Sequence, residues 1–157
     1  MQVYGWGYNG SGQLGIGNNS NQLTPVKLNG LSGIVISNLV CGFSHTLALS
    51  DGGILYGWGL NGFGQLGTGD KGNLSSPTKI CVGIGRYVIV QLLTSARNPR
   101  RLWITLFRPC RSMLSLACLT FLFIYRVIDI AATHYSQISA ALTENFKVYM
   151  WGQCRGE

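Results

Sequence analysis

Acidic residues are scarce in this sequence. Its 157 residues include 5 Asp and Glu against 12 Lys and Arg. These few carboxylates form no pair or cluster at the spacing of general acid–base or metal-binding groups. The sequence therefore gives little support to hydrolase or metal chemistry. We expect a protein that is not an enzyme, with no catalytic residue, no cofactor and no metal.

The spacing of the cysteines is uninformative. The five cysteines stand at positions 41, 81, 110, 118 and 154, with no CxxC pair and no nearby histidine to suggest zinc. An odd, scattered count fits a reducing compartment better than a disulfide framework. The N-terminus, MQVYGWG, lacks the basic and apolar regions of a secretory signal. We expect a cytoplasmic or nuclear location.

Glycine occurs 22 times but is missing from residues 87–126, which also lack Asp and Glu. The same stretch contains six arginines, at 97, 100, 101, 108, 111 and 126. These arginines account for six of the seven net positive charges of the chain. The positive charge is therefore not a basic face of the fold, and we expect no nucleic-acid partner.

No apolar run is long enough to cross a bilayer. The longest, Ser112–Tyr125, has 14 residues, whereas a spanning helix needs about 20. Arg108 and Arg111 precede it and would be costly in the bilayer. Membrane contact is not expected, although weak attachment to an anionic surface is an alternative.

The sequence does contain an internal repeat. VYGWGYNGSGQLGIG at Val3 returns as LYGWGLNGFGQLGTG at Leu55, so that Trp6 and Trp58 are 52 residues apart (58 − 6). A third start, VYMWGQCRGE, puts Trp151 93 residues after Trp58 (151 − 58), or 53 if the 40 residues 87–126 are left out. We therefore divide the chain into about two repeats (1–86), an insert (87–126) and a partial third repeat (127–157).

The glycines also fit the dinucleotide-binding pattern GxGxxG. That site requires a helix after the glycines and an acidic residue about 20 positions later. Here Asn, Gln, Ser and Pro follow, and no acidic residue lies near Gly30, which is 20 positions after Gly10. We interpret the glycines as turn residues and points of close backbone approach.

Short strand-like segments alternate with turns. Val3–Trp6, Ile34–Val40, His45–Leu49 and Ile54–Trp58 are strand-like, and Asp51-Gly52-Gly53 is a hairpin signal. About four short strands per fifty residues is typical of a β-propeller blade. We predict an all-β fold, antiparallel over residues 1–80 and without a helix of three or more turns there.

The succession YGWGxNxxGQLGxG, PxK, VCGxxHTLAL and DGGxLYGWG resembles the repeat of the regulator-of-chromosome-condensation family, a seven-bladed β-propeller. The resemblance covers about 1–86 and 127–157 and implies a partial propeller of about two repeats plus a fraction of a third. The ending is similar to a branch with a C-terminal BTB/POZ domain, thought to act as adaptors that include cullin-type ubiquitin ligases among their partners. The chain is identified as a fragment or aberrant isoform of such a protein.

The resemblance implies a non-enzymatic protein-interaction module with an unidentified protein partner, such as ubiquitin-ligase components. The alternative, by analogy with the founding member, is guanine-nucleotide exchange on a small GTPase or its regulation. In this alignment Gln137 of the third unit takes the place of His45.

Structural roles are expected for the repeat motif. We interpret His45 as structural rather than catalytic, and the tryptophans as packing between blades. The motif residues are Gly5, Trp6, Gly7, Gly12, Gln13, Leu14, Gly15, His45, Gly57, Trp58, Gly59, Gly64, Gln65, Leu66, Gly67, Trp151 and Gly152.

We interpret the insert, residues 87–126, as a translated intron that is retained in frame. Its excision restores the repeat spacing, and codons for Arg86-Tyr87-Val88 and for Phe121–Arg126 accommodate a splice donor and acceptor. A genuine family-specific loop or membrane anchor is the alternative. Because the run Leu114–Tyr125 is apolar, a helix is one conformation expected for it. The genomic sequence around codons 86 and 126 tests the intron hypothesis.

Overall fold

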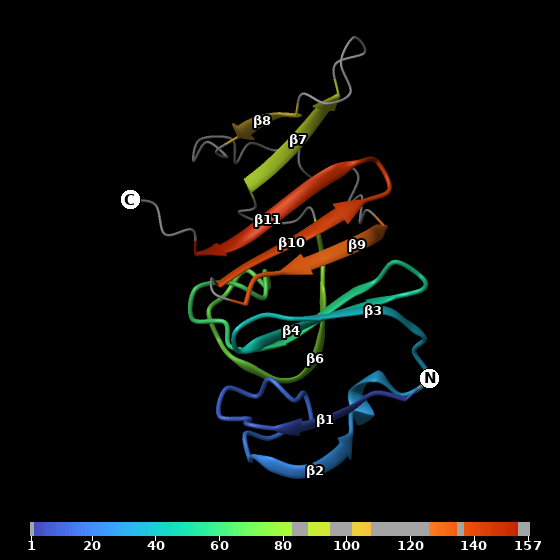
Figure 1. The fold of residues 1–157 in the computed structure, drawn as a ribbon, viewed down its shortest axis with the longest axis vertical. Coiled ribbons are helices and arrows are strands. Elements are labelled where there is room, and N and C mark those ends of the chain that lie inside the picture. The colour runs from blue at the N-terminus through green and yellow to red at the C-terminus, as the bar shows by residue number, and fades with distance from the viewer. Residues whose placement is uncertain (1, 83–87, 95–101, 108–125, 135–136, 154–157) are drawn as a thin grey trace, which may run out of the picture.

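The computed structural model describes residues 2–82, 88–94, 102–107, 126–134 and 137–153. In these residues the chain forms β-strands and one turn of 3-10 helix, η1 (Asn29–Leu31), and no α-helix (Figure 1). All strand pairs are antiparallel. The predicted all-β class is therefore confirmed, and so is the antiparallel structure over residues 2–80. None of these described residues belongs to a helix long and apolar enough to cross a bilayer.

The strands form three sheets, stacked along the long axis of Figure 1. The first sheet pairs β1 (Tyr4–Gly7) with β2 (Gln22–Lys27). The second is a four-stranded meander of β3 (Ile36–Cys41), β4 (His45–Ser50), β5 (Leu55–Gly59) and β6 (Leu74–Ile80). The third has the order β8-β7-β11-β10-β9, from β7 (Val88–Thr94), β8 (Leu102–Phe107), β9 (Val127–Ala132), β10 (Gln137–Thr143) and β11 (Lys147–Gln153).

The repeat seen in the sequence recurs in the sheets. The strands that end in Trp-Gly, β1, β5 and β11, take equivalent places, and the hairpin β9-β10 repeats β3-β4. In the second sheet β6 lies beside β5, with Ile80 opposite Leu55. In the third, β7 lies beside β11 with Val90 opposite Val148. A strand from the region 87–126 thus takes the place of the fourth strand. The helix considered for Leu114–Tyr125 lies outside the described residues.

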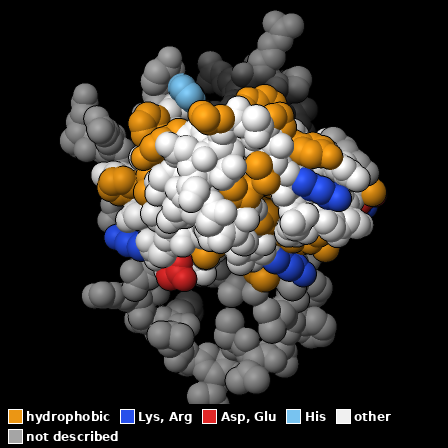
Figure 2. Space-filling view, turned by 90° about the horizontal axis from the view of Figure 1, so that it is seen from below, with side chains coloured by type: hydrophobic (Ala, Val, Ile, Leu, Met, Phe, Trp, Pro, Cys, Tyr) orange, Lys and Arg blue, Asp and Glu red, His pale blue; other side chains and the backbone are white. Residues whose placement is uncertain are grey.

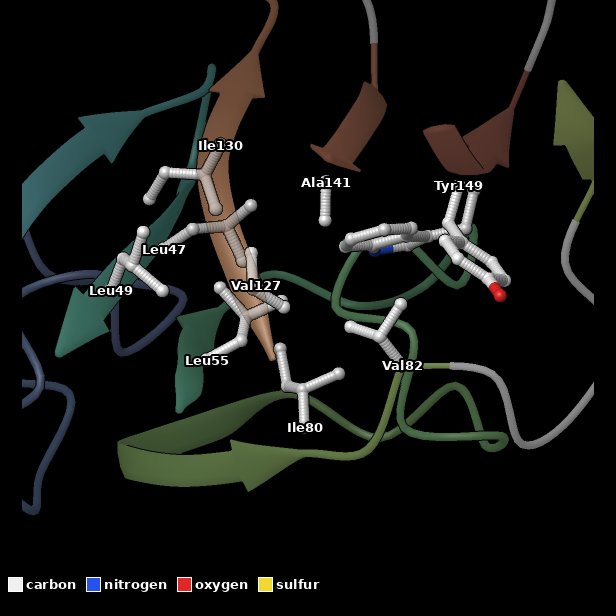
Figure 3. Packing of buried hydrophobic residues seen from close by; sticks show 10 residues of the cluster. Leu47, Leu49, Leu55, Ile80, Val82, Val127, Ile130, Ala141 and Tyr149 are labelled. Carbon is white, nitrogen blue, oxygen red and sulfur yellow. The ribbon is translucent and has the colours of Figure 1, made fainter. Parts of the chain in front are cut away.

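Two apolar clusters hold the sheets together. One lies between the second and third sheets and includes Leu47, Leu49, Val127 and Tyr149 (Figure 3). The other joins the first and second sheets around Leu28, Leu31, Ile36, Ala48 and Trp58. All six residues of β4 are buried, because this strand lies between β3 and β5 and has a neighbouring sheet on each face. Full burial of each large aliphatic side chain contributes about 1.5–3 kcal/mol.

Candidate functional site

In each of the first two repeats, one backbone carbonyl accepts hydrogen bonds from two side chains of the next repeat. The Trp58 indole N–H donates to the Gln13 carbonyl at 2.8 Å, and the Thr46 hydroxyl donates to the same oxygen at 3.0 Å. The third sheet repeats the arrangement on the Gln65 carbonyl, with Trp151 as donor at 2.8 Å and Ser139 at 2.7 Å. We call each set the inter-repeat contact. It joins successive units by hydrogen bonds that lie in a largely buried environment.

Glycine makes room for this contact. Gly15 has φ +71°, and a Cβ there would lie 2.7 Å from Trp58 Nε1. Gly67 has φ +70°, and a Cβ there would lie 2.9 Å from Trp151 Nε1. The structure therefore brings Gln13, Gly15 and Trp58 together, and their counterparts one repeat later. The first unit differs, because its tryptophan, Trp6, is 61% exposed whereas Trp58 is 1% exposed.

Two buried asparagines hold the glycine-rich loops. The Asn9 side chain donates to the Asn18 and Ser20 carbonyls and accepts the Leu14 N–H. Asn61 accepts the Leu66 N–H in the same way, and the side chains of Asn21 and Asn73 accept the Asn9 and Asn61 backbone N–H groups. The sequence analysis did not include Asn9 and Asn61 among the motif residues. Their recurrence at the 52-residue spacing (61 − 9) could have identified them.

His45 is buried in the boundary between the second and third sheets. Its Nε2 lies 2.9 Å from Ser139 Oγ. Because that hydroxyl donates its proton to the Gln65 carbonyl, Nε2 must carry a hydrogen and donate to Oγ. Burial lowers the His45 pKa to about 4, so the ring is neutral at physiological pH. Its Nδ1 has no hydrogen-bond partner among the described residues. This geometry suits a structural role for His45, as the donor of a hydrogen bond to Ser139.

The strand register corrects the alignment of the third unit. His45 pairs with Gly59, and Ile138 pairs with the equivalent Gly152. Ile138, and not Gln137, therefore takes the place of His45. Gln137 instead accepts a hydrogen bond from the side chain of Gln65. The sequence alignment was one residue out because the turns before β4 and β10 differ in length.

Three exposed aromatic side chains lie in loops at the same end of the sheets. Tyr8 is 67% exposed, Phe43 63% and Phe63 46%. They belong to the β1–β2 loop, the β3–β4 turn and the β5–β6 loop, which join the strands at the same end. We call these three residues the loop-end surface. The Asn9 and Asn61 hydrogen bonds hold the two loops that carry Tyr8 and Phe63. Among the residues that the structure describes, no group of three or more His, Cys, Asp or Glu could hold a metal.

A groove of about 210 Å³ opens between the first and second sheets. Its walls come from β1, β3, β4, β5 and the loop after β1. The lining includes Gly5, Leu14, Leu28, Leu39, Cys41 and Thr46. Most of these side chains are apolar, so the groove suits apolar groups better than a charged ligand.

Comparison with known families gives one assignment. A family model described as "Regulator of chromosome condensation (RCC1) repeat" matches residues 2–49 and 52–92, which is more than half of the chain. The Ultraviolet-B receptor UVR8 of Arabidopsis thaliana is 45% identical over 80 residues, covering 51% of this chain and 18% of that protein. The human protein named Probable E3 ubiquitin-protein ligase HERC3 is 39% identical over 80 residues, covering 50% of this chain and 8% of that protein. The chain thus spans less than a fifth of these relatives.

Solved structures show the same fold. The crystal structure of human WBSCR16 matches 96% of this chain and 43% of its own, with TM-score 0.52 and 23% identity. Prp20p from Saccharomyces cerevisiae matches 98% of this chain and 42% of its own, with TM-score 0.50 and 19% identity. The described sheets therefore match part of the propeller structures of this kind, as the repeat pattern predicts.

Proposed function

Because the chain belongs to the RCC1 repeat family, we propose that it is a non-enzymatic protein-interaction module that binds its partner through the loop-end surface. The exposure of Tyr8, Phe43 and Phe63 at one end of the sheets carries the proposal. Aromatic residues are enriched at protein interfaces and dominate their binding energy. Loops held on a rigid scaffold are common positions for recognition residues.

We extend the proposal to an adaptor role in the cytoplasm or nucleus, of the kind that propeller–BTB proteins have, working with ubiquitin-ligase components. The support is the likeness of residues 127–157 to that branch and the name of HERC3, a probable E3 ubiquitin-protein ligase. The competing role is guanine-nucleotide exchange or regulation of a small GTPase. The support for this role is family analogy. Prp20p, whose crystal structure was described together with its binding properties to Gsp1p and histones, shares only the fold with this chain.

The test compares two sets of exposed aromatic residues. The first variant carries Tyr8→Ser, Phe43→Ser and Phe63→Ser, and the control carries Phe146→Asn in the β10–β11 turn at the opposite end. Phe146 is 73% exposed and has φ 58°, a conformation that asparagine tolerates. Binding to purified ubiquitin-ligase components should fall at least about 30-fold in the triple variant, as expected for an interface hot spot. The control should bind like the wild type.

Two results would contradict the proposal. One is unchanged binding by a triple variant whose circular dichroism shows the native fold. The other is acceleration of nucleotide release from a small GTPase by the wild-type chain, which would favour the exchange-factor role.

A further inference from the structure

Three asparagines of the chain are followed directly by glycine: Asn9, Asn29 and Asn61. Asparagine is chemically labile in this setting, because the backbone nitrogen of the next residue attacks the side-chain carboxamide and glycine has no side chain to hinder the attack. The structure places the three asparagines in very different surroundings. These surroundings determine which of them reacts.

Asn9 and Asn61 are held inside the glycine-rich loops. Both are fully buried. Each carboxamide donates to acceptors across its loop and accepts the N–H of the residue five positions later, Leu14 or Leu66, at 2.9 Å. A carboxamide held in this way cannot turn toward the following backbone nitrogen, and water does not reach it. These two asparagines therefore react only after their loop has opened.

Asn29 has none of these restraints. It is exposed, and its carboxamide makes no hydrogen bond with the described residues. It begins η1, a single turn of 3-10 helix whose N-cap residue, Leu28, provides no side-chain hydrogen bond. The Leu31 N–H reaches the Leu28 carbonyl only at 3.4 Å, which is long for a backbone hydrogen bond. A short turn held so weakly opens readily, and the Gly30 nitrogen then approaches the carboxamide.

We propose that Asn29 is a site of spontaneous modification, which converts it to isoaspartate and aspartate with water as the co-reactant. The Gly30 nitrogen forms a bond to Cγ of Asn29, the bond from Cγ to Nδ2 breaks, and the proton of the Gly30 nitrogen leaves with the amide as ammonia. Water then opens the five-membered ring. Opening at Cγ gives aspartate. Opening at the backbone carbonyl gives isoaspartate, whose main chain is one methylene longer.

The position of η1 gives isoaspartate a structural consequence. Leu31 is buried in the apolar cluster that joins the first and second sheets. Gly30 lies so close to β6 that a Cβ added there would be 2.9 Å from Pro77 Cδ. A longer main chain at residue 29 displaces these neighbours, and a closely packed interface tolerates such a displacement poorly. Isoaspartate should therefore weaken the packing between the first two sheets.

Aspartate, the other product, should be tolerated at this position. It keeps the normal main chain, and the exposed side chain stays in water. Figure 2 views the molecule from the side of the first sheet, which η1 directly follows, and charged side chains are few there. The added charge therefore meets little repulsion. Because η1 joins β2 to β3 at the end of the strands away from the loop-end surface, failure of this proposal would leave the proposed function standing.

The experiment incubates the whole chain at neutral pH and body temperature. Peptide mass spectrometry follows the loss of each amide, with Asn9 and Asn61 as controls in the same molecules. Asn29 should be converted at least about tenfold faster than either, because the buried asparagines react only in opened molecules. In denaturant the three rates should become similar. An isoaspartate-specific methyltransferase with labelled S-adenosylmethionine detects the isoaspartate product.

Two variants separate the main-chain change from the charge. Asn29→Gln keeps an amide, but its carbon is one bond too far away to form the five-membered ring, so methyl transfer to the incubated protein should be lost. Asn29→Asp carries the charge on a normal main chain. The incubated wild type should melt at a lower temperature than the fresh protein. Incubated Asn29→Gln and fresh Asn29→Asp should both melt like the fresh wild type.

Three results would overturn the proposal. The first is conversion of Asn29 in the folded chain no faster than that of Asn9 and Asn61. The second is equal methyl transfer to the incubated wild type and the incubated Asn29→Gln variant. The third is a melting temperature of fresh Asn29→Asp as low as that of the incubated wild type, since the charge and not the longer main chain would then cause the loss.

Discussion

At the level of single residues, the carbonyl groups of Gln13 and Gln65 are the points at which successive repeats meet. Each accepts an indole N–H and a hydroxyl from the following unit. A hydrogen bond of this kind contributes about 0.5–1.5 kcal/mol, and more is lost when a buried partner is left unsatisfied. Burial of the indole adds to this, so Trp58 and Trp151 should dominate the interfaces and Trp6 should not.

Replacement of Trp58 by phenylalanine tests this difference. Trp58→Phe removes the donor to Gln13 and leaves a gap in the buried cluster, and we expect a loss of about 2–3 kcal/mol in the free energy of unfolding. The matched change Trp6→Phe affects an exposed ring and should cost less than about 0.5 kcal/mol. Chemical denaturation measures both. Equal losses would contradict the assigned role of the inter-repeat contact.

His45 should make stability depend on pH. Its pKa in the folded chain is about 4, against about 6.5 in an unfolded chain. As pH falls from 6.5 to 4, the unfolded chain takes up a proton that the folded chain does not, so stability declines. The expected loss is about 3 kcal/mol in total; it develops mainly between pH 6.5 and pH 4 and levels off below pH 4.

The variant His45→Gln measures the histidine contribution. Glutamine keeps an N–H donor for Ser139 but does not titrate, so the slope of stability between pH 6.5 and 4.5 should decrease. The control is His134→Gln, at an exposed position. The interpretation would fail if the wild type and His45→Gln showed the same slope.

At the level of elements, the glycine-rich loops have a fixed shape. In each, an N–H of one glycine donates to the asparagine carbonyl three residues earlier, as Gly12 does to Asn9 and Gly64 to Asn61. Left-handed glycines then carry the chain beneath the indole of the next unit. The loops therefore position both the inter-repeat contact and the loop-end surface.

Alanine substitution separates packing from flexibility in these loops. Gly15→Ala places a methyl group 2.7 Å from Trp58 at φ +71°, and should cost at least about 2 kcal/mol. At Gly62 a Cβ would meet no described atom within 4 Å, and its φ is not left-handed. Gly62→Ala should thus change stability by less than about 0.5 kcal/mol. Thermal unfolding of both variants provides the comparison, and similar melting temperatures would refute it.

The strands and turns of the first two units were predictable from sequence, because their motifs are local and recur. Gly-Trp-Gly strands and the Asp51 hairpin are examples. The acceptor of the indole was not predictable, since a backbone carbonyl has no sequence signature and Gln13 is 45 residues from Trp58. The pairing of β7 with β11 was also missed. It joins a strand from within the predicted insert, residues 87–126, to a strand of the third repeat.

At the level of the whole molecule, the chain is a stack of units that stabilise one another through their neighbours. The middle sheet has a neighbour on both faces, and its central strand is fully buried. The first sheet packs against the second, and the side chains of Trp6, Tyr4 and Leu23 on its strands are exposed. This asymmetry explains why equivalent tryptophans differ so much in exposure.

Hydrogen exchange of the tryptophan indoles tests the inter-repeat contact most directly. In two-dimensional ¹H–¹⁵N spectra, with signals assigned by Trp→Phe substitution, the indole N–H groups of Trp58 and Trp151 should exchange slowly because each is bonded to a glutamine carbonyl of the preceding repeat. The Trp6 indole should exchange fast. Exchange of the Trp58 and Trp151 indoles as fast as that of Trp6, or protection of Trp6 alone, would contradict the stacked-repeat structure on which the proposed function depends.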